Sequence, residues 1–233
     1  MALKYLDQID VKGKRVFIRA DFNVPLDDNG SITNDNRIRE TVPTLRYILD
    51  KGGAVIIASH LGRPKGKPDP GQSLAPVAKR LGELLGLQVQ FAGDCISDGA
   101  IAQSRALKPG EVLMLENLRF YAEEEKNNED FARKLGAAAD VYINDAFACS
   151  HRAHASVEAI TRVVPVCAAG FLMKKEIVNF EKAMHRPERP LLAIIGGAKV
   201  SGKLELLENI LQKVDCLIIG GGMAFTFLKA QGL

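Results

Sequence analysis

Polar side chains suited to binding an anion recur just after the apolar runs in the first two thirds of the sequence. Arg19, Asp21 and Asn23 stand at alternate positions between the apolar residues 16–18 and Pro25. Alternate positions share one face of an extended segment, so a guanidinium, a carboxylate and an amide are expected to point the same way. The later residues of this kind are Arg37, His60, Arg63, Arg119 and Arg152.

This set of arginines predicts a binding site for a small anion. Guanidinium groups gathered in one place repel one another, and they usually occur together where an anion lies among them. The planar fork of arginine binds phosphate and carboxylate oxygens through two hydrogen bonds. We therefore predict a ligand that carries both groups. For any one arginine taken alone, the alternative is a surface ion pair, which is the commoner arrangement.

The remaining polar residues indicate no metal site and no activated nucleophile. His60 has no second possible ligand three or four residues away, so we expect it to donate a hydrogen bond to a substrate oxygen. His151 and His154 could share a face, but they are interpreted as structural groups on either side of Arg152. The charge run 123–126 is interpreted as a solvated face. The four cysteines are scattered, which suits a reducing cytosol.

A second candidate site is the glycine-rich segment 196–203, which follows an apolar run and opens a predicted helix. Glycines let the backbone approach a phosphate closely, and the amino end of a helix favours the anion. Residues 197–203 fit the G-x-x-x-x-G-K half of the P-loop pattern, but Leu204 stands where Ser or Thr would bind magnesium. We predict a phosphate site of another kind, with Lys199 and Lys203 as its ammonium groups. The alternative is a glycine turn with exposed lysines, and the triplet 220–222 could form a second wall.

The elements that must position these residues follow a strong alternation of strand and helix. The strands are expected at 15–19, 54–58, 87–91, 111–115 and 141–144, and the helices at 41–51, 73–86, 99–107 and 128–138. This alternation predicts a Rossmann-like parallel sheet in a three-layer α/β/α fold. The candidate residues follow the strands, and ligands bind at the carboxyl ends of such strands.

A second, similar unit is expected after a connecting helix. Residues 171–184 form an amphipathic pattern bounded by prolines, and strands follow at 191–195 and 216–219 with helices after each. We therefore divide the chain into a domain at 1–170, a linker helix at 171–189 and the start of a second α/β domain at 190–233. A sheet of two strands is only marginally stable alone, so either this segment packs on the first sheet or the second domain is incomplete. We favour the incomplete domain, because a proline-bounded helix separates the two sheets.

Composition excludes several other classes of protein. The chain has 233 residues, of which 47% are hydrophobic and 25% charged, and its net charge is +3. That charge is too small to indicate nucleic acid or a membrane surface as a partner. No apolar run approaches about 18 residues, and residues 1–10 are mixed and polar, so neither a membrane span nor a signal peptide is expected. We expect a cytoplasmic globular protein.

With both clusters considered together, the sequence resembles the phosphoglycerate kinases along its whole length. The resemblance is carried by RADFNVP at 19–25, ASHLGRP at 58–64, LENLRF at 115–120, NDAF at 144–147, HRAH at 151–154, GGAKV at 196–200 and GGGMA at 220–224. In that family the amino-terminal domain binds 3-phosphoglycerate or 1,3-bisphosphoglycerate. The carboxyl-terminal domain binds ADP or ATP with Mg²⁺, and a hinge closes the two domains. The resemblance implies reversible phosphoryl transfer in glycolysis between these small molecules.

The resemblance also implies a role for each matched residue of the triose site. Asp21 and Asn23 would bind the glycerate part of the substrate. Arg37 would reach the phosphoryl group that is transferred. The residues that would form a basic patch around the triose are His60, Arg63, Arg119 and Arg152.

The implied nucleotide site lies in the glycine-rich segments. Lys199 would join Arg37 at the transferring phosphoryl group, and Lys203 would hold a nucleotide phosphate. The other residues of this implied site are Gly197, Ala198, Gly221 and Gly222. The magnesium-binding aspartate and the adenine pocket of the family have no match in this sequence.

The sequence departs from the family in length, because members are close to twice as long. We therefore expect a fragment, monomeric, that binds the triose weakly and turns over little or nothing alone. Two alternatives stay open. One is a P-loop-like nucleotide hydrolase that uses residues 197–203, and the other is an anion-binding fragment that does not catalyse.

Overall fold

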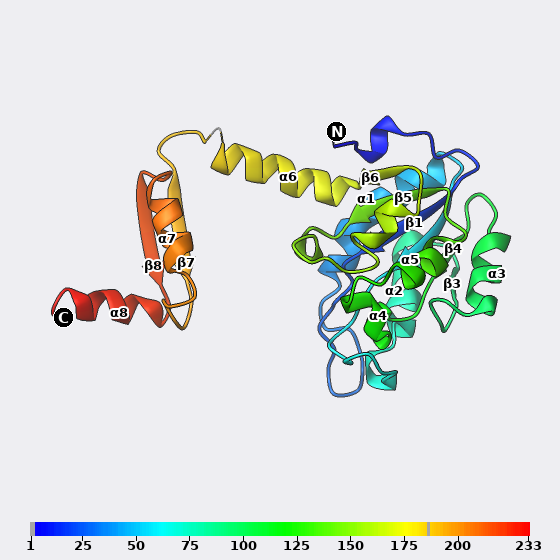
Figure 1. The fold of residues 1–233 in the computed structure, drawn as a ribbon, viewed down its shortest axis with the longest axis horizontal. Coiled ribbons are helices and arrows are strands. Elements are labelled where there is room, and N and C mark those ends of the chain that lie inside the picture. Colours follow the sequence, from blue (N-terminus) through cyan, green and yellow to red (C-terminus); the bar gives the residue numbers. More distant parts are fainter. Residues whose placement is uncertain (1–2, 186) are drawn as a thin grey trace. The chain divides into compact units, whose positions relative to one another are not determined.

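The computed structural model describes residues 3–185 and 187–233, and the chain forms two compact units. The first unit extends to Lys175, and the second begins at Glu176. Figure 1 labels most of the strands and helices of the chain. Each unit has its own parallel sheet. Among the described residues, no helix is long and apolar enough to cross a membrane.

The first unit is built on six parallel strands. They run in the order β3-β4-β2-β1-β5-β6, so β1 and β2 lie inside the sheet. Their bounds are β1 (Arg15–Ala20), β2 (Ala54–Ala58), β3 (Val89–Phe91), β4 (Val112–Met114), β5 (Val141–Asp145) and β6 (Cys167–Ala169). Strand β1 pairs Ile18 with Ile57 of β2 on one side and with Ile143 of β5 on the other. A strand with neighbours on both edges and helices on both faces is mostly apolar, and five of the six residues of β1 are buried, Arg19 among them.

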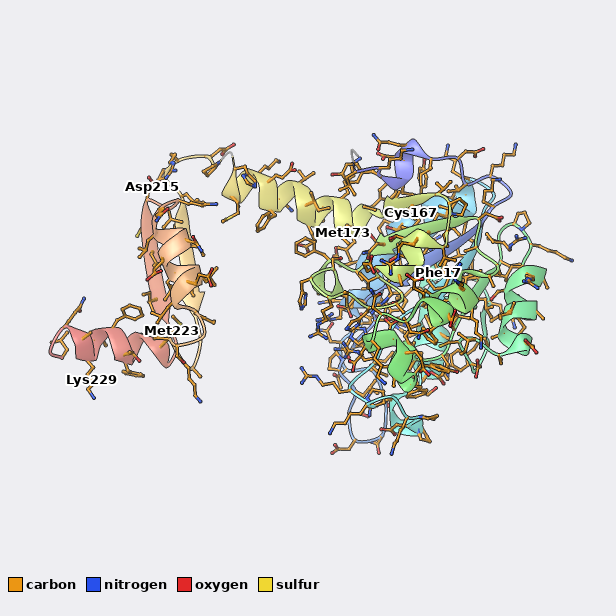
Figure 2. All side chains as sticks on the ribbon, in the orientation of Figure 1. Phe17, Cys167, Met173, Asp215, Met223 and Lys229 are labelled. Carbon is orange, nitrogen blue, oxygen red and sulfur yellow. The ribbon has the colours of Figure 1, made fainter. Side chains whose placement is uncertain are left out.

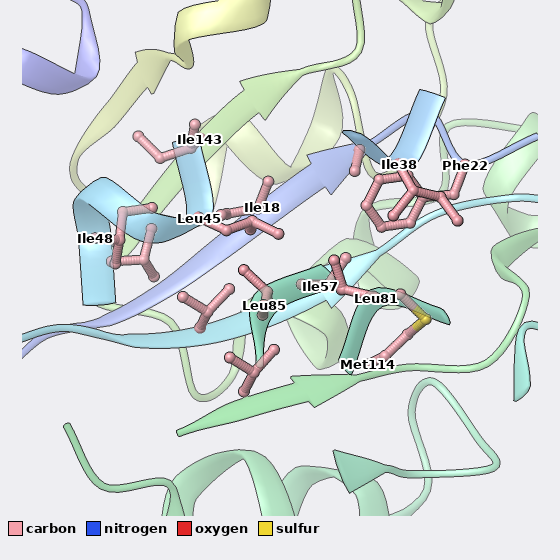
Figure 3. Packing of buried hydrophobic residues seen from close by; sticks show 14 of the residues in the cluster. Ile18, Phe22, Ile38, Leu45, Ile48, Ile57, Leu81, Leu85, Met114 and Ile143 are labelled. Atoms are coloured by element: carbon pink, nitrogen blue, oxygen red, sulfur yellow. The ribbon is translucent and has the colours of Figure 1, made fainter. Parts of the chain in front are cut away.

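Helices cover both faces of this sheet. On one face, Ile18, Ile57 and Ile143 pack with residues of α1 and α2, as Figure 3 shows for Leu45 and Leu81. The opposite face of the same strands packs against α5. The helices are α1 (Asn36–Asp50), α2 (Ala75–Leu85), α3 (Asp98–Ala106), α4 (Ala122–Glu125) and α5 (Glu129–Gly136). The short 3₁₀ turns are η1 (Leu6–Gln8), η2 (Pro70–Gln72), η3 (Leu118–Phe120), η4 (Phe147–Cys149) and η5 (Ala159–Arg162). The predicted α/β class with a parallel sheet is confirmed.

Two local predictions differ from the structure. Helix α1 begins at Asn36, five residues before the predicted start, so Pro43 lies inside the helix and not in its first turn. The Asp35 carboxylate holds this start, because it accepts hydrogen bonds from Arg39 and Arg80 at 2.8 and 2.9 Å. Strand β6 was not predicted, since three residues are too few to show a period.

The second unit has a two-stranded parallel sheet of β7 (Leu192–Gly196) and β8 (Cys216–Gly220). Each strand is followed by a helix, α7 (Leu204–Leu211) and α8 (Met223–Ala230). The side chains of Leu207 and Met223 are buried, and Met223 is labelled in Figure 2. Helix α6 (Phe171–Met184) has the predicted bounds, and its first residues belong to the first unit. The division of the sequence at 170 and 190 stays a prediction.

Candidate functional site

The first group of predicted residues follows the carboxyl end of β1. The Asp21 carboxylate accepts a hydrogen bond from the Arg37 guanidinium, which reaches it from the first turn of α1. The Arg37 side chain remains 48% exposed, whereas that of Asp21 is 11% exposed. Asp21 therefore holds one cation at the strand end and leaves that cation open to a ligand.

The loop after β2 is joined to this strand end by hydrogen bonds. Asn23 Oδ1 accepts a hydrogen bond from the Gly62 amide at 2.8 Å, and the Phe22 amide donates to Ser59 Oγ at 2.8 Å. Gly62 has a φ of +62°, and a Cβ at that position would lie 2.1 Å from Gln72 Oε1. A larger residue would strain this turn, so the glycine keeps the loop close to Asn23.

Residues after β4 hold the same loop from its other side. Asn117 Nδ2 donates to the carbonyls of Leu61 and Gln72 at 2.7 and 2.9 Å. Arg119 Nη1 donates to the Gly62 carbonyl at 2.9 Å, and only 7% of Arg119 is exposed. Burial lowers the pKa of the Arg119 guanidinium. Glu125 opposes this change, and the positive charge of Arg152 adds to it.

His60 lies where these loops meet. The residue is 5% exposed, and its Nδ1 is 3.2 Å from Arg19 Nη2 and 3.9 Å from Asp21 Oδ1. Burial and then the positive charges of Arg19 and Arg119 lower the pKa of His60 from 6.5 to about 2. The imidazole is therefore neutral near pH 7, and it is surrounded by cations.

Arg19 and Asp21 both approach His60 Nδ1, but Arg19 is buried where an exposed anion-binding arginine would not be. It is 1% exposed, and its Nε donates to Ser156 Oγ at 2.9 Å. Ser156 Oγ in turn donates to Glu124 Oε1 at 2.5 Å, and both of these residues are fully buried. Arg19 is buried because β1 lies inside the sheet, between β2 and β5. The interpretation of the charge run 123–126 as a solvated face is wrong for Glu124, because this residue is fully buried.

Arg152 and Arg63 are the more exposed arginines at this edge. Arg152 Nε donates to His151 Nε2 at 3.1 Å, and its charge lowers the pKa values of both His60 and Arg119. Arg63 follows Gly62 in the loop and is exposed, and no hydrogen bond of its side chain occurs within the described residues. His154 is buried beside Glu124, with 3.8 Å between Nδ1 and Oε1, as a structural histidine would be.

The structure thus gathers most of the predicted residues of the triose site at one edge of the sheet. Direct contacts link Asp21 with Arg37 and Asn23 with the Gly62 loop, and electrostatic effects link His60, Arg119 and Arg152. Sequence reasoning missed the buried residues that hold them, which are Asn117, Glu116, Glu124 and Ser156. Glu116 accepts hydrogen bonds from Ser73 Oγ at 2.8 Å and from the Leu74 amide at 2.9 Å. The LENLRF stretch was the one signal that could have indicated Glu116 and Asn117.

One trio of side chains at this edge could in principle ligate a metal ion. One ligand atom each from Asp21, His60 and Cys149 lie within 4.8 Å of one another. However, Arg19 Nη2 is 3.2 Å from His60 Nδ1 and 3.7 Å from Cys149 Sγ. The Asp21 carboxylate is likewise already paired with a guanidinium, that of Arg37. A cation placed there would face these guanidinium groups at short range, so the arrangement suits an anion.

The second predicted cluster lies in two adjoining loops at the carboxyl ends of β7 and β8. Lys203 Nζ donates to the Gly196 carbonyl at 2.6 Å, and the Met223 amide donates to the Gly197 carbonyl at 2.8 Å. Gly221 has a φ of +66°, and a Cβ there would lie 3.0 Å from the Gly197 carbonyl oxygen.

The remaining predicted residues of this cluster line the same two loops. A Cβ on Gly222 would lie 3.3 Å from the Ala198 carbonyl oxygen, and Lys199 is exposed. Helix α7 begins only at Leu204, after Lys203. The loops therefore offer close backbone approach and one exposed ammonium group, and their ligand stays a prediction.

Three comparisons with known proteins give one result. The family described as phosphoglycerate kinase matches residues 6–233 of the chain. The chain is 64% identical to a phosphoglycerate kinase of Geobacter metallireducens and 62% identical to one of Geotalea daltonii. Each alignment covers 100% of the chain, with 58% and 59% of the two relatives. The chain therefore spans less than two thirds of the length of these curated relatives.

Solved structures agree with the sequence relatives. The chain is similar to the phosphoglycerate kinase from Coxiella burnetii, with a TM-score of 0.87 and 40% sequence identity. It is also similar to the enzyme from Pyrococcus horikoshii, with a TM-score of 0.89 and 35% identity. Each match covers 99% of the chain and 58% of the solved chain.

Proposed function

The chain belongs to the phosphoglycerate kinase family, and from this premise we propose that its first unit binds 3-phosphoglycerate or 1,3-bisphosphoglycerate. The gathering of Arg119, Arg152 and His60 at one sheet edge, beside Asp21 and Arg37, carries the proposal. A ligand with a phosphate and a carboxylate would neutralise these cations. The family match favours this function over the P-loop-like nucleotide hydrolase.

Each residue of the triose site has a role in this proposal. Asp21 and Asn23 hold the glycerate part, since the Asp21 carboxylate can accept a hydrogen bond from a hydroxyl group and the Asn23 Nδ2 can donate one to it. The phosphate lies among His60, Arg63, Arg119 and Arg152. Because the protein supplies the positive charge, the ligand can leave water at little electrostatic cost.

The reaction that we propose is phosphoryl transfer between this ligand and a nucleotide. A carboxylate oxygen of 3-phosphoglycerate attacks the γ-phosphorus of ATP, the bond to the β–γ bridging oxygen breaks, and ADP leaves. The reverse reaction regenerates ATP. The substrate is itself the nucleophile, so the protein's part is positioning and neutralisation of charge. Arg37 and Lys199 are proposed to face the transferring group.

The second unit is proposed to bind the nucleotide phosphates through its two loops. Lys203 and the backbone of Gly197, Ala198, Gly221 and Gly222 would contact them. Segments 196–203 and 220–222 contain no Asp or Glu, so they do not fit a direct magnesium site. We propose that Mg²⁺ arrives on the phosphates of ADP or ATP, and no residue here is proposed as its ligand.

Location, partners and oligomeric state complete the proposal. We propose a monomer that acts in the cytoplasm in glycolysis and binds small molecules only. All four cysteines are free, which supports a reducing compartment. Analytical ultracentrifugation of the purified chain tests the monomer.

Calorimetric titration of the chain with 3-phosphoglycerate tests the proposed ligand. We expect one binding site, and we expect Arg152→Met to weaken binding by at least about tenfold, because a charge-assisted hydrogen bond is lost. The matched control is Arg133→Met on α5, whose side chain is 65% exposed and lies outside the site. Equal affinities for the two variants, or no binding by the unaltered chain, would contradict the proposal.

A further inference from the structure

We propose that Arg19 is a positioning residue that fixes the tautomer of His60, so that His60 meets an anionic ligand as a neutral donor through Nε2. The inference rests on the proposed function, because the ligand is taken to be the triose phosphate. It gives the buried Arg19 a role that differs from that of the arginines near the surface.

The argument begins with which nitrogen of His60 carries the proton. A guanidinium has only N–H donors and no acceptor. Arg19 Nη2 lies 3.2 Å from His60 Nδ1, so Nδ1 must be the acceptor of this hydrogen bond. In a neutral imidazole the other nitrogen then carries the hydrogen. Asp21 Oδ1 would favour the opposite tautomer, but at 3.9 Å from Nδ1 it is too far to accept a hydrogen bond.

Arg19 can impose this choice because the protein holds its guanidinium in place. Its Nε donates to Ser156 Oγ at 2.9 Å, and its Nη1 donates to the Ala20 carbonyl. Glu124 accepts hydrogen bonds from the Ser156 hydroxyl at 2.5 Å and from the Ser156 amide at 2.9 Å. Arg19, Ser156 and Glu124 are at most 1% exposed, so water does not compete for these partners.

The surroundings of His60 also keep the imidazole neutral. The groups that face it are Arg19, Asp21, Arg119, Cys149, Arg152 and His154. Burial, followed by the positive charges in this set, lowers the pKa of His60 to about 2. Within the described residues Nε2 has no hydrogen-bond partner, so its N–H is the one available to a ligand oxygen.

The tautomer can be measured directly on the unaltered chain. We would label the four histidines with ¹⁵N, record long-range ¹H–¹⁵N spectra, and assign the His60 signals with a His60→Gln variant. The proposal predicts a protonated Nε2 and an unprotonated Nδ1 from pH 5 to pH 8. A protonated Nδ1, or an imidazole that gains charge in this range, would overturn it.

Substitution of Arg19 tests whether this residue causes the preference. We expect Arg19→Met to give mixed tautomers and to weaken 3-phosphoglycerate binding by about tenfold. The double variant Arg19→Met/His60→Gln should bind no more than about twofold more weakly than His60→Gln alone. Both changes remove the same interaction, the hydrogen bond from His60 to the ligand, so their losses should not add. The matched control is Arg15→Met, at the first residue of the same strand.

Two outcomes separate this inference from its alternatives. If the losses of the single variants multiply and the tautomer of Arg19→Met is unchanged, Arg19 does not act through His60, and the inference fails. If Arg19→Met does not fold, the spectrum of the unaltered chain still decides the tautomer. If that spectrum is as predicted but 3-phosphoglycerate does not bind, the proposed function fails and the tautomer assignment stands.

Discussion

The burial of neutral His60 among cations makes the stability of the first unit depend on pH. The unfolded chain binds a proton at His60 below its ordinary pKa of 6.5, whereas the folded chain does not until about 2. The unfolded state therefore binds more protons between these values, and stability is lost as the pH falls below 6.5. From pH 7 to pH 5 the free energy of unfolding should fall by about 2 kcal/mol on account of His60.

This change can be followed without interference from the second unit. All four tyrosines, Tyr5, Tyr47, Tyr121 and Tyr142, lie in the first unit, and the chain has no tryptophan. Urea unfolding followed by tyrosine fluorescence should show a smaller loss for His60→Gln than for the unaltered chain over this pH range. Identical slopes for the two proteins would show that His60 is not held neutral.

Arg37 is expected to matter more for turnover than for triose binding. Its side chain is half exposed and held by Asp21, and in the proposed reaction it would approach the charge that develops on the transferring phosphoryl group. The test needs a longer protein, in which this chain takes the place of the matching 58% of the Geobacter metallireducens relative. In that protein, Arg37→Met should lower kcat by about 100-fold. The Kd of 3-phosphoglycerate should change by less than about tenfold, as calorimetry would report.

The control for this experiment lies on the same helix. Arg46 donates to the Leu84 and Leu85 carbonyls at 3.1 and 3.3 Å, away from the first turn, so Arg46→Met should leave kcat and Kd close to those of the unaltered protein. Equal losses in kcat and in affinity for Arg37→Met would place Arg37 in ground-state binding instead.

Most of the side chains at this sheet edge could be picked out in the sequence, because they stand in loops that follow strands of a parallel sheet, and their role as a binding site stays a prediction. The residues that hold them could not be picked out in this way. Glu124 stands in a run of exposed charge, and nothing local to that run shows that Ser156 would cover it. Arg19 stands two positions before Asp21, so the sequence places the two side chains on one face. The burial of Arg19 depends on the strands β2 and β5, which come from distant parts of the chain and flank β1.

At the scale of elements, Asn117 is the residue that holds the loop after β2 in place. Asn117→Ala would leave the buried carbonyl of Leu61 and the half-buried carbonyl of Gln72 without this donor, at a cost of about 2 kcal/mol. Urea unfolding followed by tyrosine fluorescence should report this loss, and hydrogen exchange should quicken in residues 61–66. Asn34→Ala is the control, because within the part of the chain that the structure describes its exposed side chain accepts a hydrogen bond only from the Asn36 amide. Unchanged exchange in the loop would contradict this role for Asn117.

Asp145 anchors the beginning of α6 to the end of β5. Its Oδ1 accepts a hydrogen bond from the Met173 amide at 3.0 Å, and a Cβ on Gly170 would lie 2.2 Å from the same oxygen. Loss of such a cap costs about 1 kcal/mol, so Asp145→Ala should speed hydrogen exchange at the start of α6 by about fivefold. Asp50→Ala, at the exposed end of α1, should not. Equal exchange in both variants would show that Asp145 does not cap the helix.

The order and type of the longer elements could be predicted from their apolar periods, and the bounds of α6 were predicted to the residue. The exceptions follow from contacts made at a distance. Helix α1 begins early because Arg80, on the next helix, joins Arg39 at Asp35. Strand β6 forms by pairing with the outer edge of β5. Its three residues are too few to show that pairing in the sequence.

At the scale of the whole molecule, the chain spans 58% of the Geobacter metallireducens relative, and its two units supply candidate sites for two different substrates. We expect the 233-residue chain alone to bind 3-phosphoglycerate and to show transfer to ADP or ATP only at the background rate. A coupled assay beside the calorimetric titration checks both. Turnover as fast as that of a full-length relative would contradict this expectation.

The most direct test of the account is a crystal structure of the chain soaked with 3-phosphoglycerate. We predict that the phosphate lies among His60, Arg119 and Arg152, and that the glycerate meets Asp21 and Asn23. A ligand bound elsewhere on the chain, with these side chains left in contact with solvent, would contradict the central claim that the sheet edge is a triose phosphate site.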